Sequence, residues 1–273
     1  MQQDVLQHRT AVVTGASSGI GAAIARALLE AGATVHGVAR RGDLVSDVLG
    51  AEAIESGRAV GHEADLSDPD RLDALCDQLD QAPPDIVVCS AGTNITDRRF
   101  GELTQESWET VRTLNLDSVF HLLRRTVPAM RGRGGDVVLI ASVSAQWPDH
   151  AGAAYAATKA GIVALGRGIS RDEHANGVRV TSILRGLVDT PLVDRRPSPP
   201  PAELRRWCLK PEDVSAAVLA AVSLPPRAHI PEMTVVATRL QSMGGTQDAS
   251  PELPDGLEGR SPELFEPRAV AHA

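Results

Sequence analysis

Short apolar runs alternate with longer stretches of helical periodicity through most of the chain. The runs predict β-strands at residues 10–14, 33–39, 58–62, 85–89, 136–142, 178–184 and 233–237. The stretches between them repeat apolar residues every three or four positions and predict helices at residues 24–31, 42–56, 69–81, 104–131, 153–174 and 211–224. Strands that alternate with helices in this way predict an α/β fold, with one doubly wound parallel sheet between two layers of helices.

A proline-rich segment interrupts this alternation late in the chain. The run from Pro197 to Pro201 fits neither a regular helix nor a central strand. We therefore expect residues 190–209 to form a flexible flap over the carboxyl ends of the strands, within a single domain that spans residues 1–240. Residues 241–273 are rich in glycine, proline, serine and acidic residues, and we expect this tail to be loosely ordered or to contact a neighbouring subunit.

Composition and charge exclude several classes of protein. The 273 residues carry a formal charge of -8, which argues against a general nucleic-acid-binding protein. The three cysteines are widely spaced and form neither a disulfide framework nor a metal-binding pattern, so we expect a reducing compartment and no metal site. No apolar run reaches the length of a membrane span, and residues 1–9 lack the apolar core of a signal peptide. We therefore expect a cytoplasmic protein that does not bind a membrane.

A glycine-rich turn follows the first predicted strand. Gly15, Gly19 and Gly21 lie between that strand and the first predicted helix. Glycine permits a tight turn and a close approach of the backbone to a ligand, and the amino end of a helix offers free N–H groups and a positive dipole end. The turn therefore predicts a phosphate-binding loop for a nucleotide, with a purely structural turn as the alternative.

The end of the second predicted strand indicates which nucleotide is bound. Folds of this kind usually place an acidic residue there to bind the ribose hydroxyls of NAD, but here Ala39 is followed by Arg40 and Arg41. Since no carboxylate repels a ribose phosphate and guanidinium groups bind one well, NADP(H) is favoured over NAD(H). The alternative is that both arginines are solvated surface charges. Asp65 is placed to accept a hydrogen bond from the adenine amino group. Its alternative is a helix-capping role in the segment before Pro69, and the two roles are compatible.

Tyr155 and Lys159 are the candidate catalytic residues of the helix predicted at residues 153–174. They lie four residues apart and therefore share one face of that helix. A neighbouring cation favours the phenolate form of a tyrosine, and at about 4 Å the attraction rises from about 1 kcal/mol in water to about 4 kcal/mol at an effective dielectric constant of about 20. The pair therefore needs a cleft that excludes water. The alternative is a packing tyrosine beside an exposed lysine.

Together these motifs resemble the short-chain dehydrogenase/reductase family over residues 10–237. The stretch from Thr14 to Gly21 is similar to the family's cofactor loop, and Asp65 matches its adenine-contacting aspartate. The catalytic tetrad of the family is matched in order, with the usual thirteen residues from serine to tyrosine, by Asn115, Ser142, Tyr155 and Lys159. The resemblance implies a Rossmann-type fold, a homo-oligomer (a tetramer or a dimer), and hydride transfer between NADP(H) and a small carbonyl compound or alcohol.

A second, weaker resemblance concerns the last part of the domain. Residues 210–225 and 229–238 are similar to a bacterial branch of the family whose activities include NADP-dependent oxidation of serine and other 3-hydroxy acids. This resemblance says little about the substrate of the present chain.

The family resemblance implies a role for each matched residue. Ser142 would donate a hydrogen bond to the substrate oxygen, and Tyr155 would be the general acid in reduction and the general base in oxidation. Lys159 would stabilise the phenolate and hydrogen-bond to the nicotinamide ribose, and Asn115 would hold a water that links Lys159 to solvent. The residues expected to bind the cofactor are Gly15, Ser17, Ser18, Gly19, Ile20, Gly21, Arg40, Arg41, Asp65, Leu66, Ser90, Ala91, Gly92, Tyr155, Lys159, Gly186, Val188 and Thr190. Those expected to bind the substrate are Ile95, Ser142, Trp147, Tyr155, Leu187 and Leu192, with Thr93, Asn94, Gln146 and the flap to Trp207 around them.

Two stretches depart from the family pattern. The family's Asn-Asn-Ala-Gly appears here as the residues from Cys89 to Gly92, and its Pro-Gly after the sixth strand appears as Arg185-Gly186. We expect Arg185 to point to solvent, because burying a guanidinium group without a partner is costly. Its alternative is to reach a phosphate or an anionic substrate. Other arginines near the expected pocket are predicted to be mostly surface charges, with attraction of a carboxylated substrate as the alternative: Arg98, Arg99, Arg195 and Arg196.

Two rival functions belong to other classes, since a fold does not guarantee a function. One is a nucleotide-binding regulatory or scaffold protein that kept the fold and lost the chemistry, and the complete tetrad argues against it. The other is an isomerase or dehydratase that uses the same cofactor site, which the sequence excludes only weakly.

Overall fold

The structure is a computed structural model that describes residues 5–147 and 149–240. Across these residues seven parallel strands form one sheet in the order β3-β2-β1-β4-β5-β6-β7. The strands are β1 (Thr10–Thr14), β2 (Thr34–Ala39), β3 (Ala59–Glu63), β4 (Ile86–Cys89), β5 (Gly135–Ser142), β6 (Val178–Arg185) and β7 (Glu232–Val235). Each corresponds to a predicted strand, with ends that differ by at most two residues.

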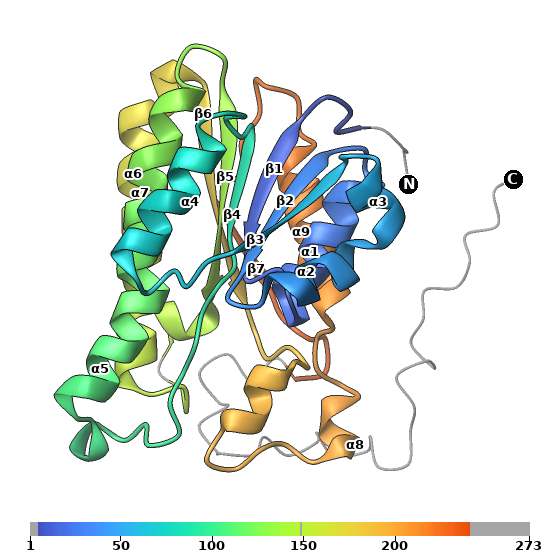
Figure 1. The fold of residues 1–273 in the computed structure, drawn as a ribbon. Helices are drawn as coiled ribbons and strands as arrows, with labels where there is room; N and C mark the ends of the chain where they lie inside the picture. The colour runs from blue at the N-terminus through green and yellow to red at the C-terminus, as the bar shows by residue number, and fades with distance from the viewer. Residues whose placement is uncertain (1–4, 148, 241–273) are drawn as a thin grey trace, which may run out of the picture.

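Helices cover both faces of the sheet. They are α1 (Gly19–Glu30), α2 (Gly42–Leu49), α3 (Ala51–Glu55), α4 (Pro69–Leu79), α5 (Gln105–Arg112), α6 (Ser118–Met130), α7 (Ala153–Glu173), α8 (Ala202–Arg205) and α9 (Pro211–Val222). Figure 1 shows α1, α2, α3 and α9 on one face, and α4, α6 and α7 on the other. The predicted Rossmann-type fold, a doubly wound parallel sheet between two helical layers, is confirmed.

The apolar runs of the strands fill two separate cores. Val12 and Val13 are neighbours in β1, and because successive side chains of a strand point to opposite faces they enter different cores. Val13 packs in the core that includes Leu28 of α1, whereas Val12 packs in the core that includes Leu122 of α6. Burial on both faces explains why these strands are continuously apolar instead of alternating.

The order of the strands places a crevice at one edge of the sheet. The chain moves outward from β1 to β2 and β3, and then returns to add β4 on the other side of β1. In open sheets of parallel strands, ligands bind beside the carboxyl ends at this point of reversal. Figure 1 shows the segment that carries α8 at that edge, below the strands.

Two of the predicted helices are divided. The helix predicted at residues 42–56 is split into α2 and α3 at Gly50, whose positive φ of 86° is not helical. The helix predicted at residues 104–131 starts after Thr104, whose side chain caps it as predicted, but it contains a π-helical segment, Thr113–Asp117, between α5 and α6. A π segment carries an extra residue per turn, so the side chains of α5 and of α6 that face the protein interior do not follow one regular helical repeat.

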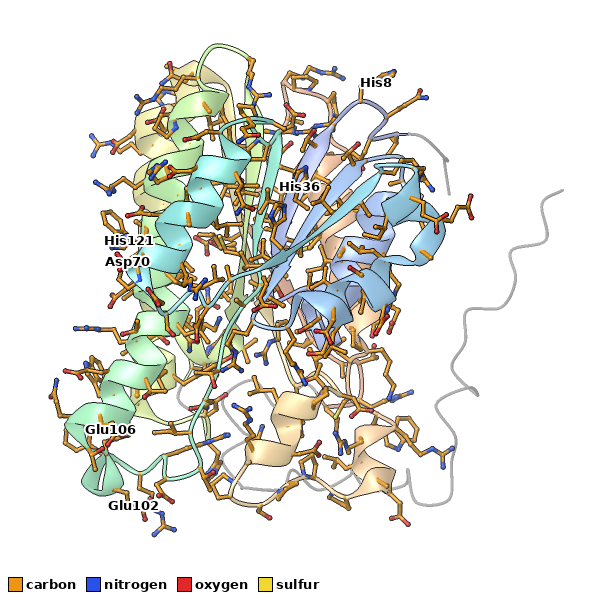
Figure 2. The ribbon with its side chains drawn as sticks, viewed as in Figure 1. His8, His36, Asp70, Glu102, Glu106 and His121 are labelled. Carbon is orange, nitrogen blue, oxygen red and sulfur yellow. The ribbon has the colours of Figure 1, made fainter. Side chains whose placement is uncertain are left out.

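The outer helical layer carries polar residues away from the sheet. Figure 2 shows Asp70 and His121 at the outer side of α4 and α6, and Glu106 at the far end of the same layer. None of the helices in residues 5–147 and 149–240 has both the length and the apolar character needed to cross a membrane.

The predicted flap at residues 190–209 lies across the carboxyl ends of the strands. It contains a short 3-10 helix, Pro191–Arg195, then the proline-rich run without regular structure, and then α8. Asp189 anchors its base, because one carboxylate oxygen accepts from Arg205 at 2.7 Å and the other from Lys210 at 2.9 Å. The predicted tail, residues 241–273, lies outside the described residues.

Candidate functional site

The glycine-rich turn packs directly against the loop that follows β4. Thr14, the last residue of β1, accepts hydrogen bonds on Oγ1 from the backbone N–H groups of Ser90 and Ala91, both at 3.0 Å. Gly15 has a φ of 72°, and a Cβ atom there would lie 3.0 Å from the Cα atom of Ala91. A Cβ atom on Gly21 would lie only 2.3 Å from the carbonyl oxygen of Gly15. The turn therefore needs glycine at both positions.

The amino end of α1 is open to an anion. The side chain of Ser18 makes no capping hydrogen bond, and the first turn contains no acidic residue. This helix end faces a cleft of about 760 Å³ whose lining includes Gly15, Ser17, Ser18, Gly19, Ile20, Gly21, Ser90, Ala91, Gly92, Tyr155 and Lys159. An uncapped helix end with a positive dipole, beside glycines that admit a close approach, fits a phosphate group.

The other end of this cleft is lined by the residues expected to hold adenosine. Arg40, Arg41, Asp65 and Leu66 all contribute to the lining, and both arginines are exposed. Asp65 accepts on Oδ1 from the N–H and the hydroxyl of Ser67, and these bonds, with the charge of Arg40, hold the pKa of its carboxyl group below the usual value. Asp65 therefore holds the turn before Pro69 through Ser67, whereas Asp68 is the residue that caps α4.

Tyr155 and Lys159 meet in a closed environment. Both side chains are buried, and Lys159 Nζ lies 5.6 Å from the centroid of the Tyr155 ring. The alternative of an exposed lysine is therefore wrong. Lys159 Nζ donates a 2.8 Å hydrogen bond to the carbonyl oxygen of Ile140. Burial, and secondarily the charge of Arg185, lower the pKa of Lys159 to about 7.

Arg185 does not point to solvent, which corrects the expectation from sequence. Its Nη2 atom donates a 2.6 Å hydrogen bond to the hydroxyl oxygen of Tyr155, and its Nη1 atom donates to the carbonyl oxygen of Gly186 at 3.1 Å. The physical reason lies in the sheet register, since Arg185 ends β6 directly opposite Ser142 at the end of β5. The expectation assumed that a buried Arg185 would have no hydrogen-bond partner. The phenolic oxygen of Tyr155 is that partner, and it offsets the cost of burying the guanidinium group.

Ser142 takes part in a chain of hydrogen bonds that sequence reasoning missed. Its hydroxyl oxygen lies 2.9 Å from that of Ser144, and Ser144 in turn donates to Asp149 Oδ2 at 2.6 Å. Because the single hydroxyl proton of Ser144 goes to Asp149, the proton between the two serines belongs to Ser142. In this structure Ser142 therefore donates to the Ser144 hydroxyl and accepts from the Ser144 backbone N–H at 3.2 Å, which leaves one lone pair for a further donor. A Ser-x-Ser run followed by an aspartate is too common to have signalled this.

Asn115 is fully buried in the π-helical segment and fixes the loop after β4. Its side-chain oxygen accepts from the N–H of Thr93 at 2.8 Å, and its nitrogen donates to the carbonyl oxygen of Thr93 at 3.0 Å. The same nitrogen lies 3.3 Å from the hydroxyl of Thr158. Asn115 therefore shapes the wall of the cleft. Its expected role in holding a water stays a prediction.

A second, smaller cavity of about 90 Å³ adjoins Tyr155 on the side of the flap. Of the expected substrate-binding residues, Ser142, Tyr155, Leu187 and Leu192 line it; of the residues expected at the cofactor, Gly186, Val188 and Thr190 do so. Among the described residues, Ile95 and Trp147 are not part of this lining. Ile95 packs instead against the cluster of Val111 and Tyr155, and a 3-10 turn, Val143–Ala145, points Ser144 instead of Trp147 into the cavity.

Two arginines that were expected to be surface charges also line this cavity. Arg98 is only 8% exposed, and it donates to the carbonyl oxygens of Ile95 at 2.6 Å and of Arg195 at 3.1 Å. Arg196 is half-buried in the same lining. Arg99 and Arg195 are exposed, as expected. Within residues 5–147 and 149–240, no group of three or more histidine, cysteine, aspartate or glutamate side chains is arranged to hold a metal ion.

Comparisons with known proteins match most of the chain. The sequence model of the family described as short chain dehydrogenase matches residues 9–200. An uncharacterized oxidoreductase of Staphylococcus epidermidis is 31% identical over 236 residues, which cover 84% of this chain and 97% of that protein. A D-beta-hydroxybutyrate dehydrogenase of Rhizobium meliloti is 33% identical over 195 residues, or 69% of this chain and 74% of that protein.

The fold is also similar to solved structures. The closed form of a serine dehydrogenase in complex with NADP+ superposes with a TM-score of 0.74 at 27% sequence identity. That match covers 83% of this chain and 94% of the other.

Proposed function

Because this chain belongs to the short chain dehydrogenase family, we propose that it is an NADP(H)-dependent oxidoreductase that interconverts a carbonyl compound and an alcohol. One observation carries the proposal: a single cleft is lined at one end by Arg40 and Arg41, in its middle by the glycine turn, and at its other end by Tyr155 and Lys159. A dinucleotide that lay along it would bring a nicotinamide beside the only tyrosine of the chain.

The lining residues fit NADP(H) in two ways. The uncapped amino end of α1 and the close approach permitted by Gly15 suit the pyrophosphate. Arg40 and Arg41, together with the absence of an acid at Ala39, suit the ribose phosphate. The likeness to a serine dehydrogenase that binds NADP+ supports this preference and also the weaker resemblance to that branch.

The chain's own residues hold and move the proton. In reduction the carbonyl carbon receives the hydride that NADPH supplies, and the carbonyl oxygen receives the proton of the Tyr155 hydroxyl, so the products are the alcohol and NADP+. Arg185 donates into the Tyr155 oxygen, which leaves the tyrosine's own proton for the substrate. As the phenolate forms, Arg185 and Lys159 place positive charge beside it.

Ser142 is the second group at the substrate oxygen in this proposal. It lines the cavity next to Tyr155, and its orientation is held by Ser144 and Asp149. In both directions the hydroxyl proton of Ser142 turns from Ser144 to the substrate oxygen. In oxidation the substrate hydroxyl gives its own proton to the Tyr155 phenolate, so it has none left to donate to Ser142. We further propose a homo-oligomer in the cytoplasm, as the family resemblance implies.

A comparison of the native protein with a Tyr155→Phe variant tests the proposal. NADPH oxidation is measured against a panel of ketones and aldehydes, and NADPH affinity is measured by cofactor fluorescence. The expected result is turnover by the native protein, loss of at least a hundredfold in kcat in the variant, and an NADPH dissociation constant within about threefold of native. If the cofactor binds but no compound gives turnover that depends on Tyr155, the regulatory alternative is favoured instead.

A further inference from the structure

The small cavity beside Tyr155 holds more positive than negative charge. Three guanidinium groups line it, those of Arg98, Arg185 and Arg196, and the opposing carboxylate in the described lining is that of Asp149. Arginine stays protonated in proteins. The charged groups of the lining therefore sum to two positive charges in a cavity that contains no second carboxylate among the described residues.

Asp149 does not neutralise the arginines by direct contact. Its Oδ2 atom accepts from the hydroxyl of Ser144 and its Oδ1 atom accepts from the N–H of Ala151 at 2.9 Å. Among the described residues, none of the three guanidinium groups lies within ion-pair distance of it. Arg98 satisfies two of its nitrogens with backbone carbonyl oxygens, which carry no net charge.

The positive charge is also enclosed. Burial, and then the charge of Arg196, lower the pKa of Arg98 to about 10, and burial with the charge of Arg185 lowers the pKa of Arg196 against the opposing pull of Asp149. The rest of the lining is largely apolar and includes Leu187, Val188, Leu192, Val193, Val236 and Leu240. These aliphatic side chains do not screen the charges, so a counter-charge placed there interacts more strongly than it would in water.

One hydrogen-bond donor at this cavity has no partner. The Nε atom of Arg185 is buried and makes no hydrogen bond within the part of the chain that the structure describes. The other two nitrogens of the same guanidinium group bond to Tyr155 and Gly186. A buried donor without a partner is costly unless a ligand supplies an acceptor.

We propose that this cavity binds the anionic group of the substrate, and that the substrate is a small carbonyl compound or alcohol that carries a carboxylate or a phosphate. The anionic group lies among Arg98, Arg185 and Arg196, and the reacting oxygen lies at Tyr155. This inference rests on the proposed oxidoreductase function, because it assigns one part of the same site. It also gives the flap's Arg196 a role, because Arg196 completes the set of positive charges that line the cavity.

Matched pairs of compounds test the inference. The native protein is assayed with NADPH and acetoacetate or levulinate, each beside its methyl ester, and with dihydroxyacetone phosphate beside dihydroxyacetone. At least one anionic compound is expected to have a kcat/KM at least tenfold above that of its neutral partner. The two keto acids and the phosphate distinguish between a carboxylate and a phosphate. Equal values within every pair would overturn the inference.

Substitution of the arginines gives the second arm. Arg196→Gln is expected to raise KM for the preferred anion at least tenfold while KM for the neutral partner changes less than about threefold. Arg98→Gln tests the same prediction, but Arg98 is buried and bonded to the backbone, so Arg196→Gln is the decisive variant if Arg98→Gln does not fold. Arg99→Gln is the matched control, because Arg99 is exposed and adjacent to Arg98. A loss of equal size in Arg99→Gln would contradict the inference.

A binding measurement separates this inference from the proposed function. Butyrate, which has no carbonyl group to reduce, is titrated into the protein with bound NADP+ by calorimetry, beside neutral butanol. Butyrate is expected to bind and Arg196→Gln to weaken it at least tenfold. If butyrate binds in this way but no compound is turned over, the anion site stands and the oxidoreductase proposal fails. If ketones are turned over but butyrate binds no better than butanol, the anion site fails alone.

Discussion

The guanidinium group of Arg185 donates a 2.6 Å hydrogen bond to the hydroxyl oxygen of Tyr155. The two residues are thirty positions apart in the chain, and they meet because Arg185 ends β6 and Tyr155 lies in the first turn of α7, which packs against β6. Lys159, in contrast, directs Nζ to the carbonyl oxygen of Ile140 and faces the tyrosine ring at a distance. The closest positive charge to the reacting oxygen therefore comes from the sheet.

Replacement of Arg185 by glutamine should slow oxidation of a neutral alcohol. The phenolate that Tyr155 needs as a base loses a charge-assisted hydrogen bond, which is worth about 1.5–3 kcal/mol and corresponds to a fall in kcat of roughly tenfold to a hundredfold. A neutral alcohol is chosen because it has no anionic group, so the change in kcat does not include the loss of a contact between Arg185 and such a group. The NADP+ dissociation constant serves as the control, and an unchanged kcat would show that the contact plays no part in the reaction.

The lowered pKa of Lys159 should make stability depend on pH. The group has a pKa of about 7 in the folded chain and 10.5 in the reference state. Between these values the unfolded chain holds a proton that the folded chain has released, so the free energy of unfolding should rise as pH increases from about 7 to about 10.5. The cost of burying the charged lysine is fully present below about pH 7.

Urea unfolding of the native protein and of Lys159→Met across this pH range measures the effect. The native protein should gain stability relative to the variant by a few kcal/mol, at about 1.4 kcal/mol per pKa unit. Other titrating groups are common to both proteins and cancel in the difference. Parallel curves for the two proteins would mean that Lys159 is not held in an environment that opposes its charge.

Arg40 and Arg41 should set the choice between cofactors. In an Arg40→Ala, Arg41→Ala double variant the NADPH dissociation constant should rise about tenfold to a hundredfold, because charge-assisted hydrogen bonds to a ribose phosphate are lost. The NADH dissociation constant should change less than about threefold, since NADH lacks that phosphate. Titration of cofactor fluorescence gives both constants, and the single variants show which arginine matters. Equal losses for the two cofactors would argue for a general effect on the cleft.

Gly21→Ala should disable the phosphate-binding turn. The added Cβ atom would lie 2.3 Å from the backbone oxygen of Gly15, and backbone cannot yield as a flexible side chain does. We expect NADPH affinity to fall at least about tenfold and the protein to lose about 1–3 kcal/mol of stability. Gly168→Ala is the matched control, because that glycine lies exposed in α7 with open space around it. It should gain about 0.5–1 kcal/mol and bind NADPH normally.

The parts of the site that sequence could predict are those that depend on short spacings. The four-residue step from Tyr155 to Lys159 guarantees that they are neighbours in any helix, and the glycine turn lies between one strand and one helix. The alternation of strands and helices also predicts which edge of the sheet carries both. None of these inferences requires knowledge of which strand pairs with which.

The parts that sequence could not predict depend on contacts between distant segments. The position of Arg185 follows from the register of β6 against β5, and that of Arg98 follows from carbonyl groups of a loop and of the flap. Nothing in the local pattern separates the buried Arg98 from the exposed Arg99 beside it. Trp147 is an error in the opposite direction. A large aromatic residue near Ser142 suggests a pocket wall, but after the 3-10 turn Val143–Ala145 it is not part of the cavity lining.

The π-helical segment Thr113–Asp117 joins α5 and α6 into one continuous helix, and it changes the direction in which the side chains on its two sides face. On its amino side Val111 belongs to the small cluster around Tyr155, and on its carboxyl side Leu122 belongs to the core under the sheet, with Asn115 turned inward between them. Each residue of a regular helix advances the rotation by about 100°. Deletion of one residue here would convert the π-helical hydrogen bonds to the regular α-helical pattern. It would also rotate α5 relative to α6, so that one of the two no longer faced its core. A regular α-helix without the extra residue would therefore make the protein less stable, because one half of the helix would lose its contacts with the core.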